Sequence, residues 1–413
     1  MGSLIKLSVA FLTVKLLQLA IVALTPGRFD TSSQIIIDEV RLNYPKTAFS
    51  PVKNYVLLIL DKFITWDSVY FNDLFVNAIK YEHQFVFCPS WWRLIKNLPW
   101  GNSSYYGKLA LSMVISNACH YGSFVLLYKL TSRMFPSNFT SNNSRFLYLS
   151  SLMLIFSPAG IFLTTGYSES LCTFLSFATI YLREWSLTYV DFKQRNNKSV
   201  TFPVIYMLSG TILALNFTVR ANAMLLGGLY VHDLYEFAII NHNITNSILA
   251  IVTGSQLLLS IITLNLHSYL LFCPGREWCN YKIPLLFSYA QHHYWNVGFL
   301  NYWTPNNIPN FLFALPTVII NIASIRYFVN ELPRLKKMSS LILVNILLLL
   351  GGVFFWHVQI LTRISSFLPL SYWYIAIVLT NDPNNRFAKI SVYYMIIWNL
   401  VQSSLFAGFL PPA

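Results

Sequence analysis

Positions 248–271 read ILAIVTGSQLLLSIITLNLHSYLL, a run of 24 residues without an Asp, Glu, Lys or Arg. A helix of about 20 apolar residues crosses the hydrocarbon core of a bilayer. The rest of the 413-residue chain has the same character, because 55% of its residues are hydrophobic, 16% are aromatic and only 10% are charged. The sequence therefore predicts an all-α polytopic membrane protein and excludes one soluble core.

Similar apolar runs predict ten or eleven membrane-spanning helices in a single integral-membrane domain over residues 1–413. The expected spans lie near 5–25, 107–130, 146–164, 168–183, 203–219, 222–240, 248–271, 311–328, 341–360, 370–381 and 390–409. With the N-terminus in the cytosol, the connections that hold most Lys and Arg all fall on the cytosolic side. The net charge of +13 then reflects membrane orientation, and nucleic acid is excluded as a partner.

Two long segments, about 26–106 and 272–310, fall on the opposite, luminal side. Seven of the fifteen acidic residues lie in the first of them. We expect these segments to contain amphipathic or interfacial helices and to form the catalytic face of the protein.

Asp67 is the acidic residue whose position is most unusual. At helical spacing Phe63, Tyr70, Leu74 and Ala78 share one face, and Asp67 lies in the middle of it. Burial among aromatic side chains is costly for a carboxylate and raises its pKa toward the range that suits proton abstraction. The pattern therefore indicates a catalytic base.

Aromatic and amide side chains are concentrated in the second luminal segment, where positions 291–305 read QHHYWNVGFLNYWTP. Tyr294, Trp295 and Trp303 offer faces for the C–H side of a pyranose, and Asn296 offers hydrogen bonds to its hydroxyls. An interfacial aromatic belt explains the same composition equally well.

Cys273 and Cys279 bracket a five-residue loop in the same segment. A zinc site requires further Cys or His ligands at suitable spacing, and the sequence near this loop supplies none. We therefore expect a disulfide. The adjacent His292 and His293 do not share a helical face, and we expect no metal or other cofactor.

Nucleotide-binding and hydrolase motifs are missing from the chain. There is no phosphate-cradling Gly-rich loop, Walker motif, Ser-centred nucleophile elbow or His-Glu-x-x-His pair. A membrane protein with luminal acids and aromatics but no nucleotide site is expected to take its activated substrate from the membrane, which points to lipid-linked chemistry.

Several short motifs together resemble one known family. They are Trp66-Asp67-Ser68-Val69-Tyr70-Phe71, Tyr81-Glu82-His83, Gly166-Tyr167-Ser168-Glu169-Ser170, Arg220-Ala221-Asn222, Tyr294-Trp295-Asn296-Val297-Gly298-Phe299 with Tyr302-Trp303, and Thr362-Arg363. In this order they look like the PIG-V family, the GPI mannosyltransferase 2 family of the polytopic GT-C glycosyltransferase class. The match covers most of the chain.

The resemblance implies a multi-pass enzyme of the endoplasmic reticulum membrane with its active site facing the lumen. Such an enzyme transfers the second mannose, in α-1,6 linkage, from dolichol-phosphate mannose to the glycosylphosphatidylinositol (GPI) precursor. The reaction inverts the anomeric carbon in a single displacement, for which Asp67 is our hypothesis for the base. Fungal members of the family also resemble enzymes that act with a small membrane accessory subunit.

Other polar residues receive weaker assignments. Arg220 and Arg363 lie at predicted luminal helix ends and suit the donor phosphate, although snorkelling arginines are common there. Glu82, His83 and Glu169 are candidates for binding the acceptor or sugar, and local polar networks are the alternative. Another dolichol-phosphate-sugar transferase of the same class, a transporter and a non-catalytic protein of glycolipid assembly are the competing functions.

Overall fold

The computed structural model describes residues 2–31, 33–35, 37–38, 51–87, 89–99, 104–192 and 195–412. Helices dominate this part of the chain, and one antiparallel hairpin joins β1 (Leu187–Phe192) to β2 (Arg195–Val200), with Leu187 opposite Val200. The sequence did not predict this hairpin, whose strands lie outside the apolar spans. The all-α polytopic class is nevertheless confirmed.

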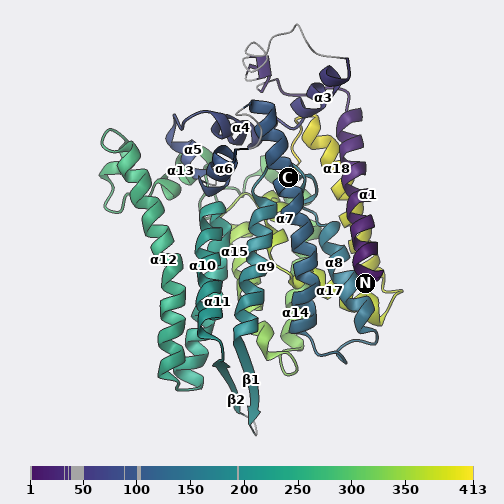
Figure 1. Ribbon diagram of the computed structural model, residues 1–413, viewed down its shortest axis with the longest axis vertical. Helices are drawn as coiled ribbons and strands as arrows, with labels where there is room; N and C mark the ends of the chain where they lie inside the picture. Colours follow the sequence, from purple (N-terminus) through teal and green to yellow (C-terminus); the bar gives the residue numbers. More distant parts are fainter. Residues whose placement is uncertain are drawn as a thin grey trace.

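The helices of the bundle run side by side (Figure 1). They are α1 (Gly2–Leu24), α7 (Tyr105–Met134), α8 (Asn143–Ile155), α9 (Glu169–Ser186), α10 (Pro203–Val219), α11 (Gly227–Tyr235), α12 (Ile244–Phe272), α14 (Ile308–Asn330), α15 (Ser339–Phe354), α17 (Leu370–Asn381) and α18 (Arg386–Ala407). Short helices lie around their ends: α3 (Pro51–Asp61), α4 (Ser68–Val76), α5 (Glu82–Val86), α6 (Pro89–Asn97), α13 (Leu286–Trp295) and α16 (Leu361–Ile364).

Short 3-10 helices and one short π-helix complete the secondary structure of the described residues. They are η1 (Gly160–Leu163), η2 (Ala221–Leu226), η3 (Glu236–Ile240), η4 (Glu277–Asn280), η5 (Pro305–Asn307), η6 (Lys336–Met338), η7 (Val358–Ile360) and η8 (Ser365–Phe367). Among the described residues, seven helices are long and apolar enough to cross a membrane, or up to eight if a pair bent by 76°, Val358–Phe367 with Leu370–Asn381, is one span.

Three of the predicted spans are shorter or more polar than a simple membrane helix. The region 203–219 is a helix of 17 residues, and α9 carries Arg183 and Glu184 near its end. The predicted continuous span at 146–164 was wrong, because α8 ends at Ile155 and the chain unwinds before Pro158. All three regions still lie within the bundle (Figure 1).

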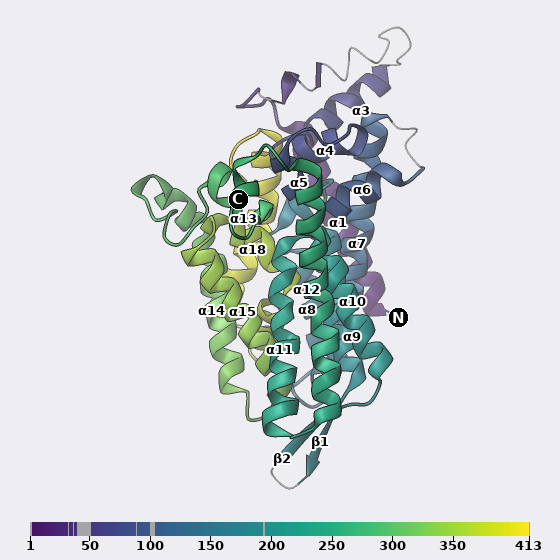
Figure 2. The ribbon, with the colours of Figure 1, turned by 90° about the vertical axis from the view of Figure 1, so that its left-hand side faces the viewer.

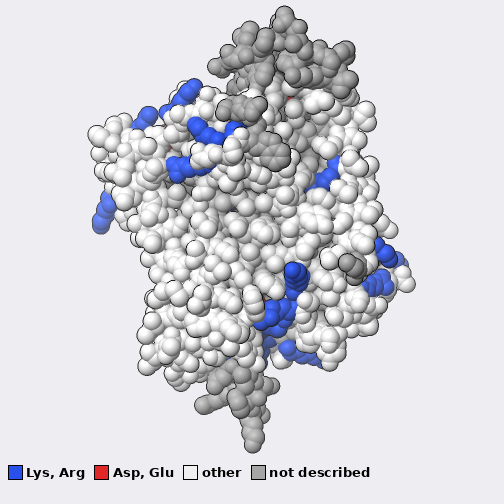
Figure 3. All heavy atoms as spheres, viewed as in Figure 1, with Lys and Arg blue, Asp and Glu red and all other residues white. Residues whose placement is uncertain are grey.

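The bundle has two distinct ends. The short helices α3 to α6 and α13 lie at one end, which we call the Asp67 end, and β1 and β2 extend from the opposite, hairpin end (Figures 1 and 2). Both long segments that we expected to be luminal thus lie together. On the face shown in Figure 3, the Lys and Arg side chains form groups toward the two ends, with a largely uncharged zone between them.

The segment between α8 and α9, residues 157–168, lies inside the bundle and is irregular apart from the short helix η1. Its backbone groups are bonded by side chains from other helices, as a break in a membrane helix requires. The Lys15 ammonium donates to the Leu163 carbonyl at 3.1 Å, and the Gln402 amide accepts from the Ile161 N–H at 3.1 Å. Further bonds come from Asn399 to Ser157 O, Gln402 to Pro158 O and Asn117 to Thr164 O.

Candidate active site

Asp67 immediately precedes α4, at the end of a tight turn that follows α3. Trp66 has a φ of 53°, which is an outlier for a bulky residue. Its ring stacks on Phe409 with centroids 5.3 Å apart, and its indole N–H donates to the Leu410 carbonyl at 3.2 Å. The C-terminal residues of the chain therefore hold the strained turn, and strain of this kind is concentrated at functional sites.

This turn corrects the predicted helical face around Asp67. Phe63 lies before α4 and Ala78 lies beyond its end, so these two residues do not share a helix with Tyr70 and Leu74. The left-handed conformation of Trp66 breaks the continuous helix that the apolar spacing suggested. The Asp67 side chain is 32% exposed, so it is accessible to a substrate rather than enclosed by aromatic rings.

The Tyr167 hydroxyl holds the first turn of α4 in place through two hydrogen bonds. The Ser68 N–H donates to the Tyr167 hydroxyl oxygen at 3.2 Å, and that hydroxyl donates to the Thr65 carbonyl at 3.3 Å. Burial and the nearby Asp67 carboxylate raise the pKa of Tyr167 well above its usual value. The phenol therefore stays protonated and acts as a rigid strut; the sequence reasoning named it only as part of a motif.

Four charged side chains form a continuous ion network beside this turn. Arg363 contacts Asp67 (Nη1 to Oδ2, 3.1 Å) and Glu169 (Nε to Oε1, 2.9 Å), and Arg220 contacts the same Glu169 oxygen from its Nη1 at 2.9 Å. Two cations thus balance two carboxylates. The side chain of Glu169 is 1% exposed and those of Arg220 and Arg363 are 13% and 15% exposed, so Asp67 is the more accessible of the two acids.

The surrounding elements hold each member of the network in place. Glu169 is the first residue of α9, where the helix dipole favours a carboxylate. Arg363 lies in α16, at the bend before α17, and its guanidinium lies 4.8 Å from the centroid of the Phe162 ring. Arg220 caps the C-terminus of α10 and also donates to the Ser168 hydroxyl at 3.2 Å.

Arg363 occupies only one oxygen of Asp67. Among the residues that the structure describes, Oδ1 of Asp67 has no hydrogen-bond partner, and the carboxylate makes no cap bond to α4. An acceptor oxygen is therefore available on the more exposed acid of the network. This geometry suits a base that is held by one oxygen and reacts with the other.

An aromatic cluster continues from α4 onto α5 and α13. Tyr70 stacks on Phe87 with centroids 4.9 Å apart, Trp295 meets the Phe87 edge at 5.5 Å, and His83 lies between Tyr70 and Tyr294 at 5.5 and 5.3 Å. The structure thus brings the predicted His83, Tyr294 and Trp295 into one cluster, which contacts α4 through Tyr70. Burial lowers the pKa of His83, although Glu82 opposes the shift.

Glu82 is buried and bound by donors from the second long segment. The Tyr294 hydroxyl donates to Oε1 at 2.7 Å and the Trp278 indole N–H donates to Oε2 at 2.8 Å, while the Arg276 Nε lies 3.7 Å away. Burial and the bond to Glu82 raise the pKa of Tyr294 to about 12. Glu82 therefore joins the two long segments that we expected to be luminal, a role that the sequence did not distinguish from acceptor binding.

Cys273 and Cys279 are joined by a disulfide in the structure, with their Cα atoms 5.8 Å apart. The closed loop contains both Arg276 and Trp278. A short covalent loop restricts the positions of these side chains and keeps the indole of Trp278 against Glu82.

The other two predicted sugar-binding residues, Asn296 and Trp303, make contacts of a different kind from those of the aromatic cluster. Asn296 ends α13 in a left-handed conformation with a φ of 51°, which is a helix-capping role. The Trp303 indole N–H donates to the Val353 carbonyl at 2.8 Å, and its ring packs near Phe311 and Phe354. The structure therefore assigns Trp303 to the junction of α14 and α15.

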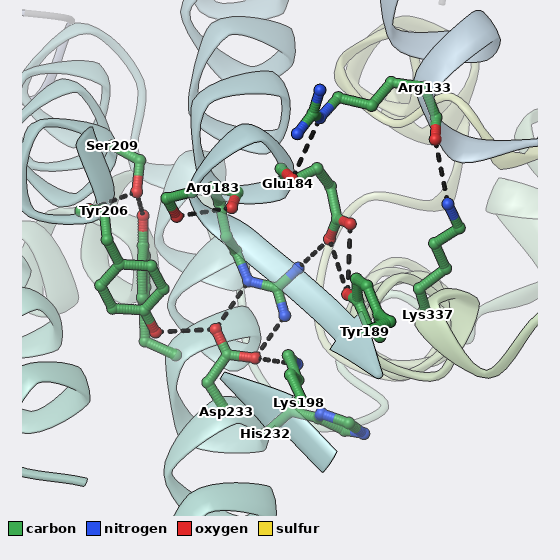
Figure 4. Close-up of polar contacts among 12 residues, drawn as sticks. Arg133, Arg183, Glu184, Tyr189, Lys198, Tyr206, Ser209, His232, Asp233 and Lys337 are labelled. Atoms are coloured by element: carbon green, nitrogen blue, oxygen red, sulfur yellow. Dashed lines mark hydrogen bonds and ion pairs between the residues drawn. The ribbon is translucent and has the colours of Figure 1, made fainter. Parts of the chain in front are cut away.

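A second ion network lies at the hairpin end (Figure 4). Asp233 accepts from Arg183 Nε and from the Tyr206 hydroxyl at 2.7 Å each, and Lys198 of β2 lies against Asp233 and, at 2.7 Å, Glu236. His232, Asp233 and Glu236 have the spacing of a metal site, but cations already pair with both acids. The sequence indicated this network only by placing charged residues, such as Arg183 and Asp233, inside predicted membrane spans.

Comparison with known proteins completes the description of the site. A family model described as "Mannosyltransferase (PIG-V)" matches residues 3–413. The chain is 49% identical to the GPI mannosyltransferase 2 of Candida albicans over 411 residues, which are 99% of each chain. It is 34% identical to the protein of the same name from Saccharomyces cerevisiae over 98% of this chain and 99% of the relative. No solved structure matches.

Proposed function

Because the chain belongs to the PIG-V family of mannosyltransferases, we propose that it transfers the second mannose of the GPI core from dolichol-phosphate mannose, forming an α-1,6 bond. The proposed site is the luminal face of the endoplasmic reticulum membrane. Support comes from the names of the relatives and from an accessible carboxylate beside an ion network of one buried acid and two partly buried arginines at one end of an apolar bundle.

In the proposed reaction, Asp67 is the base. The acceptor hydroxyl gives its proton to Oδ1 while its oxygen bonds to C1 of mannose, and the bond from C1 to the phosphate oxygen breaks. The electron pair leaves with dolichol phosphate. The observation that carries this assignment is a 32% exposed carboxylate with one oxygen held by Arg363 at 3.1 Å, whose other oxygen, Oδ1, has no hydrogen-bond partner among the described residues. General-base assistance contributes about 100-fold to 10,000-fold in rate.

The two arginines take different roles in this proposal. Arg363 contacts both acids of the network, so its role is to orient Asp67 rather than to bind phosphate. Arg220 contacts Glu169 alone among acidic side chains of the described residues, and its guanidinium is the group that we assign to the donor phosphate. A cation at the departing phosphate offsets the developing negative charge without a metal.

The aromatic cluster of Tyr70, His83, Phe87, Tyr294 and Trp295 supplies the proposed sugar-binding surface. Tyr70 and Tyr294 are 38% and 44% exposed, so a ligand can reach part of each ring. Aromatic faces pack against a pyranose, and the imidazole of His83 bonds hydroxyls. Glu82 supports this surface through Tyr294. A small membrane accessory subunit remains part of the proposal.

Mannose transfer in isolated membranes tests the proposed function. Membranes from cells that lack the endogenous enzyme are supplied with this chain, labelled dolichol-phosphate mannose and a GPI precursor carrying one mannose. We expect a product with two mannoses whose new bond is cleaved by an α-1,6-specific mannosidase. A label that requires a sugar nucleotide donor, or that is released only by a mannosidase of another linkage, would refute the assignment.

A further inference from the structure

The last turn of α18 and the residues that follow it, 405–410, lie at the Asp67 end of the bundle (Figure 1), and we call them the α18 cap. The Phe409 N–H donates to the Phe406 carbonyl at 3.1 Å, and the Leu410 N–H donates to the Leu405 carbonyl at 2.9 Å. With Phe409 in the left-handed region, at a φ of 57°, these two bonds define a Schellman motif. Glycine is the usual residue at that position, because a Cβ strains the left-handed backbone. Helix capping alone therefore does not explain a phenylalanine there.

The phenyl ring of Phe409 makes a contact that glycine would lose. It stacks on the ring of Trp66, with centroids 5.3 Å apart and 25° between the two planes, and Phe409 is only 7% exposed. Trp66 is itself left-handed, with a φ of 53°. The Leu410 carbonyl accepts from the Trp66 indole N–H at 3.2 Å. The stack and the hydrogen bond together hold the Trp66 side chain against the α18 cap.

The backbone conformation of Trp66 sets the direction of the residue that follows it, Asp67. The Asp67 Oδ2 lies 3.1 Å from Nη1 of Arg363. A change of φ or ψ at Trp66 would turn the chain after it and move the carboxylate relative to Arg363. Arg363 thus holds the side chain of Asp67, and the α18 cap holds the backbone that precedes it.

The α18 cap is itself anchored at the Asp67 end. The Gly408 carbonyl accepts from the Phe29 N–H at 2.7 Å, and the Phe406 ring packs against Tyr167 with centroids 5.8 Å apart. Tyr167 is the residue whose hydroxyl bonds the first turn of α4. A strained backbone persists only where the surrounding structure fixes it, and these contacts meet that condition.

We propose that Phe409 is a positioning residue for the base: its ring holds Trp66 in the left-handed conformation and thereby places Asp67 for proton transfer. The proposal deepens the function given above and rests on Asp67 as the base. Phe409 acts through Trp66 and touches no reacting atom. The ring contact with Trp66 accounts for a phenylalanine at a position that favours glycine.

Substitution of Phe409 by glycine separates positioning from helix capping. Phe409→Gly removes the ring but places the preferred residue in the cap, so the end of α18 stays well capped. His242→Gly is the matched control, because His242 is also left-handed, with a φ of 49°, and lies between η3 and α12 at the hairpin end. Phe409→Leu, which keeps an apolar side chain without a flat ring, is the second variant in case Phe409→Gly unfolds. Thermal unfolding of each full-length variant verifies that it is folded.

Hydrogen exchange and mannose transfer are then measured on the same purified proteins. We expect both Phe409 variants to exchange the amides of residues 65–71 faster than wild type does. Their kcat should fall about 10-fold to 100-fold, with the donor KM nearly unchanged, because the base is displaced and donor binding is not. His242→Gly should match wild type in both measurements.

The two measurements distinguish failure of this proposal from failure of the proposed function. A wild-type kcat in folded Phe409→Gly, unchanged exchange at residues 65–71, or an equal loss of kcat in His242→Gly would overturn the positioning role of Phe409. Hydrogen exchange does not depend on mannose transfer. Faster exchange in the Phe409 variants of a protein whose wild type transfers no mannose would therefore refute the proposed function and leave the hold of Phe409 on the turn in place.

Discussion

At the scale of single residues, Arg363 is the side chain on which the geometry of the site depends. It contacts Asp67 at 3.1 Å and Glu169 at 2.9 Å and lies over the Phe162 ring. Lysine has one point charge in place of the planar fork, so it cannot reproduce both contacts. Arg363 and Arg220 are therefore expected to affect different kinetic constants, kcat for Arg363 and the donor KM for Arg220.

We predict that Arg363→Lys lowers kcat by up to about 100-fold through misplacement of Asp67 and leaves the donor KM nearly unchanged. Arg220→Lys should instead raise the donor KM, since its guanidinium is assigned to phosphate. Steady-state mannose transfer over a range of donor concentrations separates the two effects. The reverse pattern, with donor KM raised only in Arg363→Lys, would exchange the two assignments.

His83 provides a prediction of pH dependence. Burial lowers its pKa below the ordinary value of about 6.5, so the folded protein favours the neutral imidazole. The stability that the neutral imidazole of His83 contributes is present above its pKa in the unfolded chain. This stability is lost as the pH falls through the lower pKa of His83 in the folded protein. We expect the melting temperature of wild type, relative to His83→Gln, to decrease between pH 7 and pH 5. A difference that is constant or grows at acidic pH contradicts this sign.

At the scale of elements, the segment 157–168 between α8 and α9 helps to position the Asp67 end of the bundle. It connects α8 to Glu169, and its backbone is bonded by Lys15, Asn117, Asn399 and Gln402. These side chains come from α1, α7 and α18, which are far apart in the sequence. These hydrogen bonds hold the backbone of residues 157–168 in one conformation.

Gln402→Leu should destabilise the protein by about 1–3 kcal/mol, because it leaves the Ile161 N–H and the Pro158 carbonyl without partners. Thermal unfolding in detergent measures the loss. Ser404→Ala, on the same helix and without a side-chain bond among the described residues, is the control. Equal stability of the two variants would show that these bonds are not required.

The sequence predicted some elements well and others poorly, for physical reasons. Apolar runs such as 248–271 reported helices directly, because the bilayer imposes their length. The face proposed around Asp67 failed because a strained Trp66 ends the helical pattern, and its partner Phe409 is remote in sequence. The pairing of Asp67 with Arg363 spans 296 residues and has no local signal.

At the scale of the whole molecule, the bundle separates two charged ends. The Asp67 network and the aromatic cluster lie at one end, and Arg183, Lys198 and Asp233 are paired at the other. The distribution of Lys and Arg in the chain is the basis on which we propose that the hairpin end faces the cytosol. The proposed orientation then places Asp67 in the lumen.

Thiol labelling of sealed microsomes tests this orientation. In a background with Cys88, Cys119 and Cys172 replaced by Ser, Tyr70→Cys marks the Asp67 end and Arg334→Cys marks the opposite end. A membrane-impermeant maleimide should label Arg334→Cys at once and Tyr70→Cys only after permeabilisation. Labelling of Tyr70→Cys in intact microsomes would place the site on the cytosolic side.

The most direct test of the central claim is the turnover of Asp67→Asn, since the amide keeps the shape of the side chain but cannot accept the proton. The purified variant is assayed for mannose transfer at saturating dolichol-phosphate mannose, alongside wild type with the same thermal unfolding. We predict a kcat lower by about 100-fold to 10,000-fold, with the donor KM nearly unchanged. An Asn variant that turns over at close to the wild-type rate would contradict the assignment of Asp67 as the base.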